Sequence, residues 1–241
     1  MNAKKTNPVR GEVPRGASVL KRPARQIFLI SPANASSLRG SLLLGDSGKS
    51  TLEQRLRAEG AELGEIFSFI SGLYFRGKLA YARAYADPPP RVAGVWVITA
   101  SGGLVSPDRI LTLEGLREIV AGRVDAANSS YRIPLEREAR RLLDHLGHCQ
   151  VILLGSIATP KYIEPLLTIF GERLMFPAEF VGRGDMSRGG LLLRSVREKV
   201  QLTYIPVAGA VRHGLRPPKL PRAGPAALFE VRKPVVRRWK R

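Results

Sequence analysis

Short apolar runs, each bounded by glycine, proline, serine or charged residues, recur along this chain. Those at 27–30, 94–101, 149–156 and 202–209 have the length and continuous hydrophobicity of strands buried on both faces. Strands that alternate with helices favour an α/β fold, here a single three-layer domain at 27–211 with a mostly parallel central sheet. Apolar positions three or four residues apart predict the helices, at 51–59, 63–86, 112–121, 134–148 and 159–171.

Glycine and proline refine the ends of these elements. The long helix after residue 63 is expected to bend near Ser71-Gly72. Pro134 is expected to begin the next long helix, and Thr159 to cap the last one. The segment "GRGDMSRGG" at 182–190 holds four glycines and predicts a loop rich in glycine and arginine.

The formal net charge of +19 is concentrated at the two ends of the chain. Residues 1–26 hold seven Lys or Arg and one acid, and residues 212–241 hold ten and one, whereas 27–211 is nearly balanced. Both ends are rich in Pro and Gly, so they predict basic flexible arms whose partner is a polyanion, DNA or RNA. A solubilising tail, or contact with a ribosome or a membrane surface, is the alternative. The residues predicted to contact nucleic acid are Lys4, Lys5, Arg237, Arg238, Trp239, Lys240 and Arg241.

Apolar runs and cysteine content indicate a cytoplasmic protein. No run approaches the roughly 20 residues that span a bilayer, and the first residues lack the apolar segment of a secretory signal. The lone Cys149 cannot form an internal disulfide. With His145 and His148 it makes a metal-like grouping without a fourth ligand. The sequence therefore predicts no metal and no cofactor.

The segment "LLLGDSGKST" at 42–51 ends like a phosphate-binding loop. Such a loop needs a glycine five residues before Gly48, where this chain has Leu43. Starting from Gly45 makes the loop two residues short and places Asp46 where a phosphate would approach. A surface turn that leads into a capped helix is therefore favoured, with a divergent phosphate cradle around Lys49 as the alternative.

A Gly-Gly turn follows the second predicted strand, where α/β proteins often hold ligands. The bare backbone of Gly102 and Gly103 lets a ligand approach, and Asp108 follows in the next turn. A tight turn followed by a short helix is the alternative. With the polar cluster on the preceding helix, the candidate ligand residues are Tyr74, Arg76, Lys78, Ser101, Gly102 and Gly103.

A second candidate site follows the third predicted strand. Ser156 precedes a helix whose N-terminal amides suit an anion. The segment at 182–190 adds Arg183 and Arg188 for phosphate or carboxylate, with Asp185 as a general base between them. The alternative is a solvated surface loop in which Asp185 pairs with a neighbouring arginine.

Three segments resemble a known family. Residues 30–33, "ISPA", resemble the opening "ISPAK" of the YaaA-type peroxide-stress family. Residues 73–86 and 101–108 are similar to "LYxGxxFxxAxxYA" and "SAxxGLLxPDxxI" of related bacterial and phage domains. Residues 71–74, "SGLY", with Gly103-Leu104, Pro107-Asp108 and Ile110, resemble pieces of the YaaA-type motif "SGLYGLLRPLDLIxPY". The match covers 27–110, departs at Asn34, where the family has Lys, and lacks that motif's Pro-Tyr after Ile110. The resemblance implies an α/β fold, a pocket between the end of the first strand at Ser31 and the Gly-Leu-x-x-Pro-Asp turn at 103–108, and an association with DNA or nucleobases.

Together these observations favour a nucleic-acid-associated protein that acts on a nucleobase or nucleotide. The resemblance points to N-glycosidic bond chemistry, as in a nucleoside or DNA base hydrolase or transferase. Asp108 or Asp185 would stabilise positive charge on the sugar or activate water. Two alternatives stay open: a non-catalytic DNA- or RNA-binding protein that uses its basic arms, and a divergent P-loop NTPase.

Overall fold

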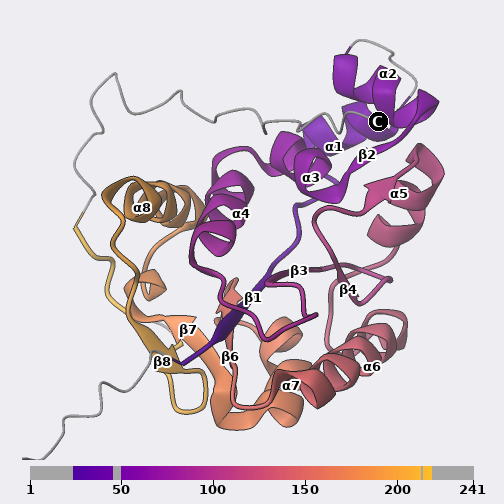
Figure 1. Ribbon diagram of the computed structural model, residues 1–241. Helices are drawn as coiled ribbons and strands as arrows, with labels where there is room; N and C mark the ends of the chain where they lie inside the picture. The colour runs from indigo at the N-terminus through magenta and orange to yellow at the C-terminus, as the bar shows by residue number, and fades with distance from the viewer. Residues whose placement is uncertain (1–23, 46–49, 213, 219–241) are drawn as a thin grey trace, which may run out of the picture.

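The computed structural model describes residues 24–45, 50–212 and 214–218 of the 241-residue chain. Its centre is a six-stranded sheet in the order β4-β3-β1-β6-β7-β8 (Figure 1). The four inner strands are parallel, and the two edge strands run antiparallel to their neighbours. The predicted α/β fold with a mostly parallel sheet is confirmed. The strands are β1 Gln26–Ile30, β3 Val95–Ile98, β4 Leu104–Val105, β6 Gln150–Leu154, β7 Leu174–Pro177 and β8 Tyr204–Pro206.

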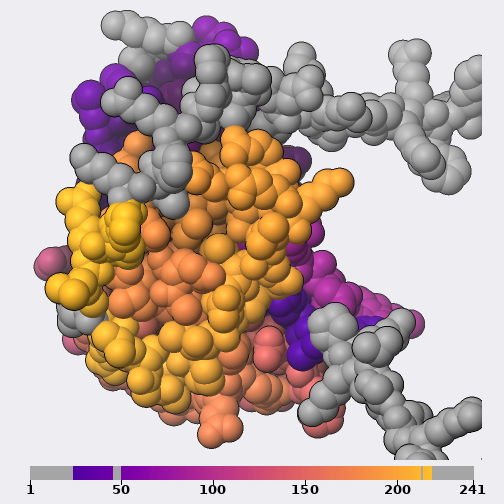
Figure 2. All heavy atoms as spheres, turned by 90° about the vertical axis from the view of Figure 1, so that its left-hand side faces the viewer, coloured from indigo at the N-terminus to yellow at the C-terminus, as the bar shows by residue number. Residues whose placement is uncertain are grey.

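Helices cover both faces of this sheet. On one side α4 (Leu73–Tyr85) packs against α8 (Asp185–Glu198), and on the other α6 (Ser129–Leu146) packs against α7 (Pro160–Phe170) (Figure 1). The segment from β7 to the end of the described chain, coloured orange to yellow, makes up most of the α8 side in Figure 2.

A group of shorter elements lies beyond the carboxyl end of β1 (Figure 1). Two of its strands form a separate antiparallel ribbon. These elements are α1 Leu38–Leu44, α2 Thr51–Ala58, β2 Ala61–Glu62, α3 Leu63–Ser71, β5 Ile110–Leu111 and α5 Leu113–Val120. Single 3₁₀ turns at η1 Gly171–Arg173 and η2 Ala178–Phe180 flank β7.

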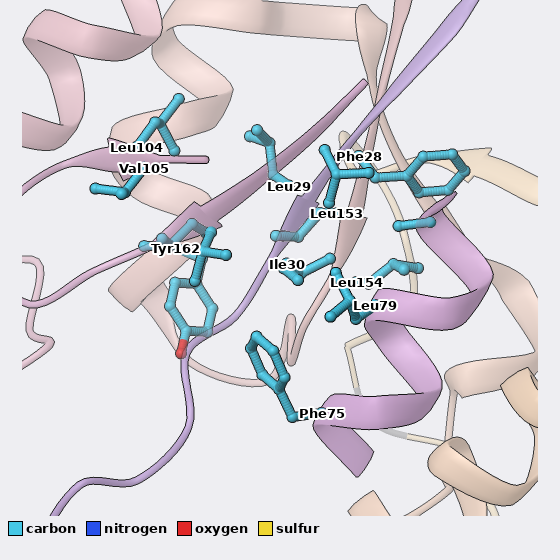
Figure 3. Close-up of a cluster of buried hydrophobic side chains, with 14 of the residues drawn as sticks. Phe28, Leu29, Ile30, Phe75, Leu79, Leu104, Val105, Leu153, Leu154 and Tyr162 are labelled. Carbon is cyan, nitrogen blue, oxygen red and sulfur yellow. The ribbon is translucent and has the colours of Figure 1, made fainter. Parts of the chain in front are cut away.

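The core lies where the central strands meet the helices. Every residue of β1 is buried, because the strand has a neighbour on each side and helices on both faces. Figure 3 shows Phe75 and Leu79 of α4 packed beside Ile30 of β1 and Leu154 of β6. Leu29 and Leu153, which are paired in register, face the opposite side of the sheet. This double coverage explains why the strands read as continuous apolar runs in the sequence.

Two local predictions are confirmed. The long helix after residue 63 breaks at Gly72, whose φ of +63° ends α3 and begins α4. Ser50 caps α2 through a hydrogen bond from the backbone N–H of Glu53 to its side-chain oxygen.

The prediction that Pro134 begins a helix is wrong. Helix α6 starts at Ser129, five residues earlier, with Asn128 as its N-cap. Pro134 lies inside this helix, where it leaves the carbonyl group of Ser130 without its helical N–H partner. Ser130 is exposed, so water can reach that carbonyl group.

The prediction of a loop over 182–190 is also wrong, because α8 begins at Asp185. Gly189 lies inside this helix, where an added Cβ would sit 2.9 Å from Cα of Tyr74 on α4. A Cβ on Gly77 would sit 2.8 Å from the backbone oxygen of Gly189. These two glycines allow α4 and α8 to approach closely, so this glycine-rich sequence serves helix packing.

The structure also bears on the "LLLGDSGKST" segment. A phosphate-binding loop follows a strand, but residues 42–44 form the end of α1. The loop residues themselves, at 46–49, lie outside the described residues. The part that the structure describes therefore lacks the strand that the P-loop alternative requires at 42–44.

Candidate functional site

A pocket of about 470 Å³ lies at the carboxyl ends of β1 and β6. From β1 the chain moves to β3 on one side, and it then crosses to β6 on the other side of β1. This reversal opens a crevice in which open α/β sheets bind ligands. Five segments contribute the polar lining, which consists of Ser31, Asn34, Ser36, Ser71, Tyr74, Arg123, Ser156, Lys161, Tyr162 and Asp185.

The side chain of Lys78 lies directly behind this lining and is only 1% exposed. Its Nζ contacts Ser31 twice, at 2.5 Å from the backbone oxygen and 2.7 Å from Oγ. It also lies 4.4 Å from the ring centroid of Tyr74. Burial lowers the pKa of Lys78 to about 7, because desolvation penalises the charged amine.

Two tyrosines form apolar walls with polar tips. The hydroxyl group of Tyr74 is buried and makes no hydrogen bond of good geometry with any described residue, although the Arg188 guanidinium lies near it. Burial raises the pKa of Tyr74 to about 12. Burial likewise raises the pKa of Tyr162, and the neighbouring Ser31 hydroxyl offsets part of that shift. Figure 3 shows the Tyr162 hydroxyl pointing away from the core. Burial therefore dominates the electrostatics of both tyrosine hydroxyls at this pocket.

The pocket presents more positive than negative charge. Lys161 and Arg123 line it, and Asp185 is the one acid among its lining residues. Arg188, 11% exposed, donates to the backbone oxygen of Phe180 at 3.1 Å and lies 3.9 Å from Asp185. This arrangement suits an anionic ligand.

Two helix N-termini reach this site without side-chain caps. Thr159 occupies the N-cap position of α7, but its hydroxyl accepts no hydrogen bond from the helix, contrary to the predicted cap. Gly184 precedes α8 and has no side chain to offer. Lys161 and Asp185, in the first turns of these helices, both line the pocket. Positive helix ends therefore add to the attraction for an anion.

Part of the candidate set predicted from sequence meets at this pocket. Ser31, Tyr74, Ser156 and Asp185 line it, although they come from four separate segments. Lys78 lies behind Ser31. Arg188 lies beside Tyr74 and Asp185.

Other predicted residues make contacts away from the pocket lining. Asp108 pairs with Arg83 and is exposed. The Ser101 hydroxyl donates to the backbone oxygen of Glu118, and Arg183 donates to that of Glu179 at 3.0 Å. Arg76 is exposed on α4.

The Gly102-Gly103 turn packs against another helix. A Cβ on Gly103 would lie 2.6 Å from the backbone oxygen of Pro134, and its φ is +69°. Thr99 closes the turn: its Oγ1 accepts a hydrogen bond from the Gly102 N–H, and its backbone N–H donates to the backbone oxygen of Gly103. The tight-turn alternative thus accounts for both glycines.

Six polar lining residues were not among the predicted site residues: Asn34, Ser36, Ser71, Arg123, Lys161 and Tyr162. Lys161 and Tyr162 follow Thr159-Pro160, a helix start directly after a buried strand, which is a usable signal. Arg123 lies in the connection before α6, and no local pattern marks it. Asn34 is the position at which the chain departs from the YaaA-type motif.

Several other predictions concern absences or the ends of the chain. Within 24–45, 50–212 and 214–218, no helix has the length and hydrophobicity to cross a bilayer. Over the same residues, no three His, Cys, Asp or Glu side chains group in a way that could hold a metal ion. Lys4, Lys5, Arg237, Arg238, Trp239, Lys240 and Arg241 lie outside the described residues.

No family model, curated protein or solved structure matches this chain.

Proposed function

We propose that this protein binds a nucleotide at the carboxyl ends of β1 and β6 and acts on its base or sugar. One observation supports this proposal most directly: Lys161, Arg123 and two uncapped helix N-termini surround one pocket, at the place where the strand order of the sheet reverses. Each of these groups favours a phosphate, and their effects are concentrated on one place.

The size and the remaining walls of the pocket fit a nucleotide better than a lone phosphate. Its volume of about 470 Å³ falls within the range of small-molecule sites. Phe67, Tyr74 and Tyr162 supply aromatic surface for a base or a sugar. Asn34 and Ser156 add amide and hydroxyl groups that can recognise base or sugar edges. The similarity of residues 27–110 to the YaaA-type family, with its association with nucleobases, supports the same ligand class.

Asp185 is the carboxylate that we assign to N-glycosidic chemistry. It lines the pocket, and its side chain is 71% exposed, so a ligand can reach it. Asp108 had the same predicted role, but it is paired with Arg83 away from the lining. A carboxylate at the pocket mouth can stabilise positive charge on the sugar or activate water for attack on C1′.

Calorimetric titration of the full chain tests the binding step. We expect nucleoside monophosphates to bind more tightly than the matching nucleosides or inorganic phosphate. Lys161→Met should weaken nucleotide binding about 10- to 100-fold, the effect of losing a charge-assisted hydrogen bond. Lys199→Met is the matched control, because Lys199 is exposed at the end of α8. Nucleotide binding that Lys161→Met leaves unchanged would contradict the proposal.

The chemical step needs a separate assay. Release of free base from nucleosides and from single-stranded DNA should be lost in Asp185→Asn while nucleotide affinity is kept. Absence of base release from every substrate, with nucleotide binding intact, would leave a binding protein without this activity.

The basic ends support a further part of the proposal, contact with DNA or RNA. Replacing Arg237, Arg238, Lys240 and Arg241 together by Gln should weaken binding to a labelled oligonucleotide and flatten its dependence on salt. Mononucleotide binding should stay unchanged. If oligonucleotide affinity does not fall, the non-catalytic alternative that relies on the arms loses its basis.

A further inference from the structure

Ser31 and Lys78 form a contact whose geometry suits chemistry as well as binding. Nζ of Lys78 lies 2.7 Å from Oγ of Ser31 and 2.5 Å from the Ser31 backbone oxygen. Ser31 lines the pocket directly after β1, whereas Lys78 is buried behind it on α4. A ligand in the pocket therefore contacts the serine, and the serine contacts the lysine.

The surroundings of Lys78 match the donors and acceptors of a neutral amine. A neutral amine has two N–H groups and one lone pair. One N–H can go to the Ser31 backbone oxygen, and the second can face the Tyr74 ring, whose centroid is 4.4 Å away. The lone pair can then accept the proton of the Ser31 hydroxyl, which reverses the hydrogen bond that a protonated Lys78 donates to Oγ. A charged ammonium would instead be buried without an ion pair to any described residue, and Asp185 is the acid whose charge favours it.

The charged groups that face Lys78 come from two further helices. Lys161 of α7 and Arg188 of α8 disfavour the ammonium, and Asp185 of α8 favours it. Desolvation is the largest influence, and the resulting pKa of Lys78 is about 7. A large share of the amine is unprotonated at neutral pH, which is the state that a general base requires.

We infer that Ser31 is a nucleophile and Lys78 its general base, in a serine–lysine pair that transfers an acyl group from an ester or an amide. Oγ of Ser31 attacks the carbonyl carbon while its proton passes to Nζ of Lys78. When the tetrahedral intermediate collapses, the bond from carbon to the leaving oxygen or nitrogen breaks, and Nζ gives its proton to that atom. Water then attacks the acyl-serine; Lys78 takes the proton of the water and returns it to Oγ of Ser31.

Two neighbouring features favour attack by Ser31. Gly155 lies beside it, and an added Cβ there would come within 3.2 Å of Cβ and 3.5 Å of Oγ of Ser31. The glycine leaves room around the hydroxyl group. The uncapped N-terminus of α7 places a positive helix end at the same pocket, where it would stabilise an oxyanion. This acyl-transfer step does not rest on nucleotide binding.

Covalent labelling of the full chain tests the pair without any nucleotide. The protein is treated separately with phenylmethanesulfonyl fluoride, an alkyl fluorophosphonate and p-nitrophenyl acetate, and adducts are located by intact mass and peptide mapping. We expect one adduct per chain, on Ser31, and none in Ser31→Ala. Lys78→Met should slow the labelling about 100-fold or more, because it keeps the volume but removes the base. The control variant Lys199→Met, which changes an exposed lysine, should be labelled on Ser31 at the rate of the unaltered protein.

A pH profile of the unaltered protein gives a second readout that needs no variant. The labelling rate should rise with pH to a midpoint near the Lys78 pKa of about 7 and level off above it. Three results would each overturn the inference: no adduct on Ser31, an unchanged rate in a folded Lys78→Met, or a profile without a midpoint near neutral pH. A purely structural contact between Ser31 and Lys78 predicts all three.

Discussion

The buried amine of Lys78 lowers the stability of the fold at neutral pH, and Lys78→Met measures by how much. The pKa of this amine falls from an ordinary value of 10.5 to about 7 in the fold. The unfolded chain thus binds the proton more tightly than the folded chain. At about 1.36 kcal/mol for each pH unit between the two values, the penalty at pH 7 is on the order of 4 kcal/mol.

This penalty has a defined direction with pH. Because the folded-state pKa is the lower one, the free energy of unfolding rises as pH increases from 7 toward 10.5, where the unfolded chain loses the same proton. Between pH 7 and pH 9 the Lys78 amine should add about 2 kcal/mol to the stability of the unaltered protein. Lys78→Met lacks this dependence, since methionine fills a similar volume without a titratable group.

Urea unfolding at pH 7 and at pH 9 provides the assay. The quantity of interest is the difference in unfolding free energy between the unaltered protein and Lys78→Met, in which the titration of all other groups cancels. This difference should shift by about 2 kcal/mol in favour of the unaltered protein at pH 9. Lys199→Met should show no such shift, because Lys199 is exposed. An equal difference at both pH values would refute the reasoning, because it would mean that Lys78 keeps its charge in the folded chain at pH 7 and at pH 9, as it does in the unfolded chain.

Three further predictions concern packing, capping and an exposed ion pair. Gly189→Ala should lower the unfolding free energy by about 1–3 kcal/mol, because the added Cβ would meet the backbone of α4. Gly184→Ala is the control: its added Cβ would have no atom within 4 Å, so the unfolding free energy should change by only a few tenths of a kcal/mol. Thr112→Ala should lower the unfolding free energy by about 1 kcal/mol, because the Thr112 side chain caps α5. Thr159→Ala should lower it less, because the Thr159 hydroxyl makes no capping hydrogen bond, and thermal unfolding measures both effects. Asp108→Asn should change the unfolding free energy by less than about 1 kcal/mol and leave nucleotide affinity unaltered in calorimetry, since its partner arginine is half-exposed and the pair lies away from the pocket lining.

The sequence by itself determined the elements whose signals are local. The run at 27–30 became a strand because a short, continuous apolar run that ends at a proline favours a strand buried on both faces. Gly72 ended one helix and began another because glycine, which has no Cβ, adopts the positive φ of this break without steric cost. Thr112 capped its helix through a hydrogen bond that spans three residues. Alternating strands and helices then fixed the fold class.

Only the tertiary structure decided which polar residues meet. Ser31, Tyr74, Ser156 and Asp185 are far apart in the chain, and the order of the strands brings them to one pocket, whereas Asp108 is left outside. The same applies to "GRGDMSRGG", whose glycines look like loop residues until the approach of another helix explains Gly189. Burial of Lys78 likewise depends on packing from several elements at once. These properties arise from contacts between segments that are distant in the sequence. A local pattern of residues does not tell how far apart such segments lie in the folded chain.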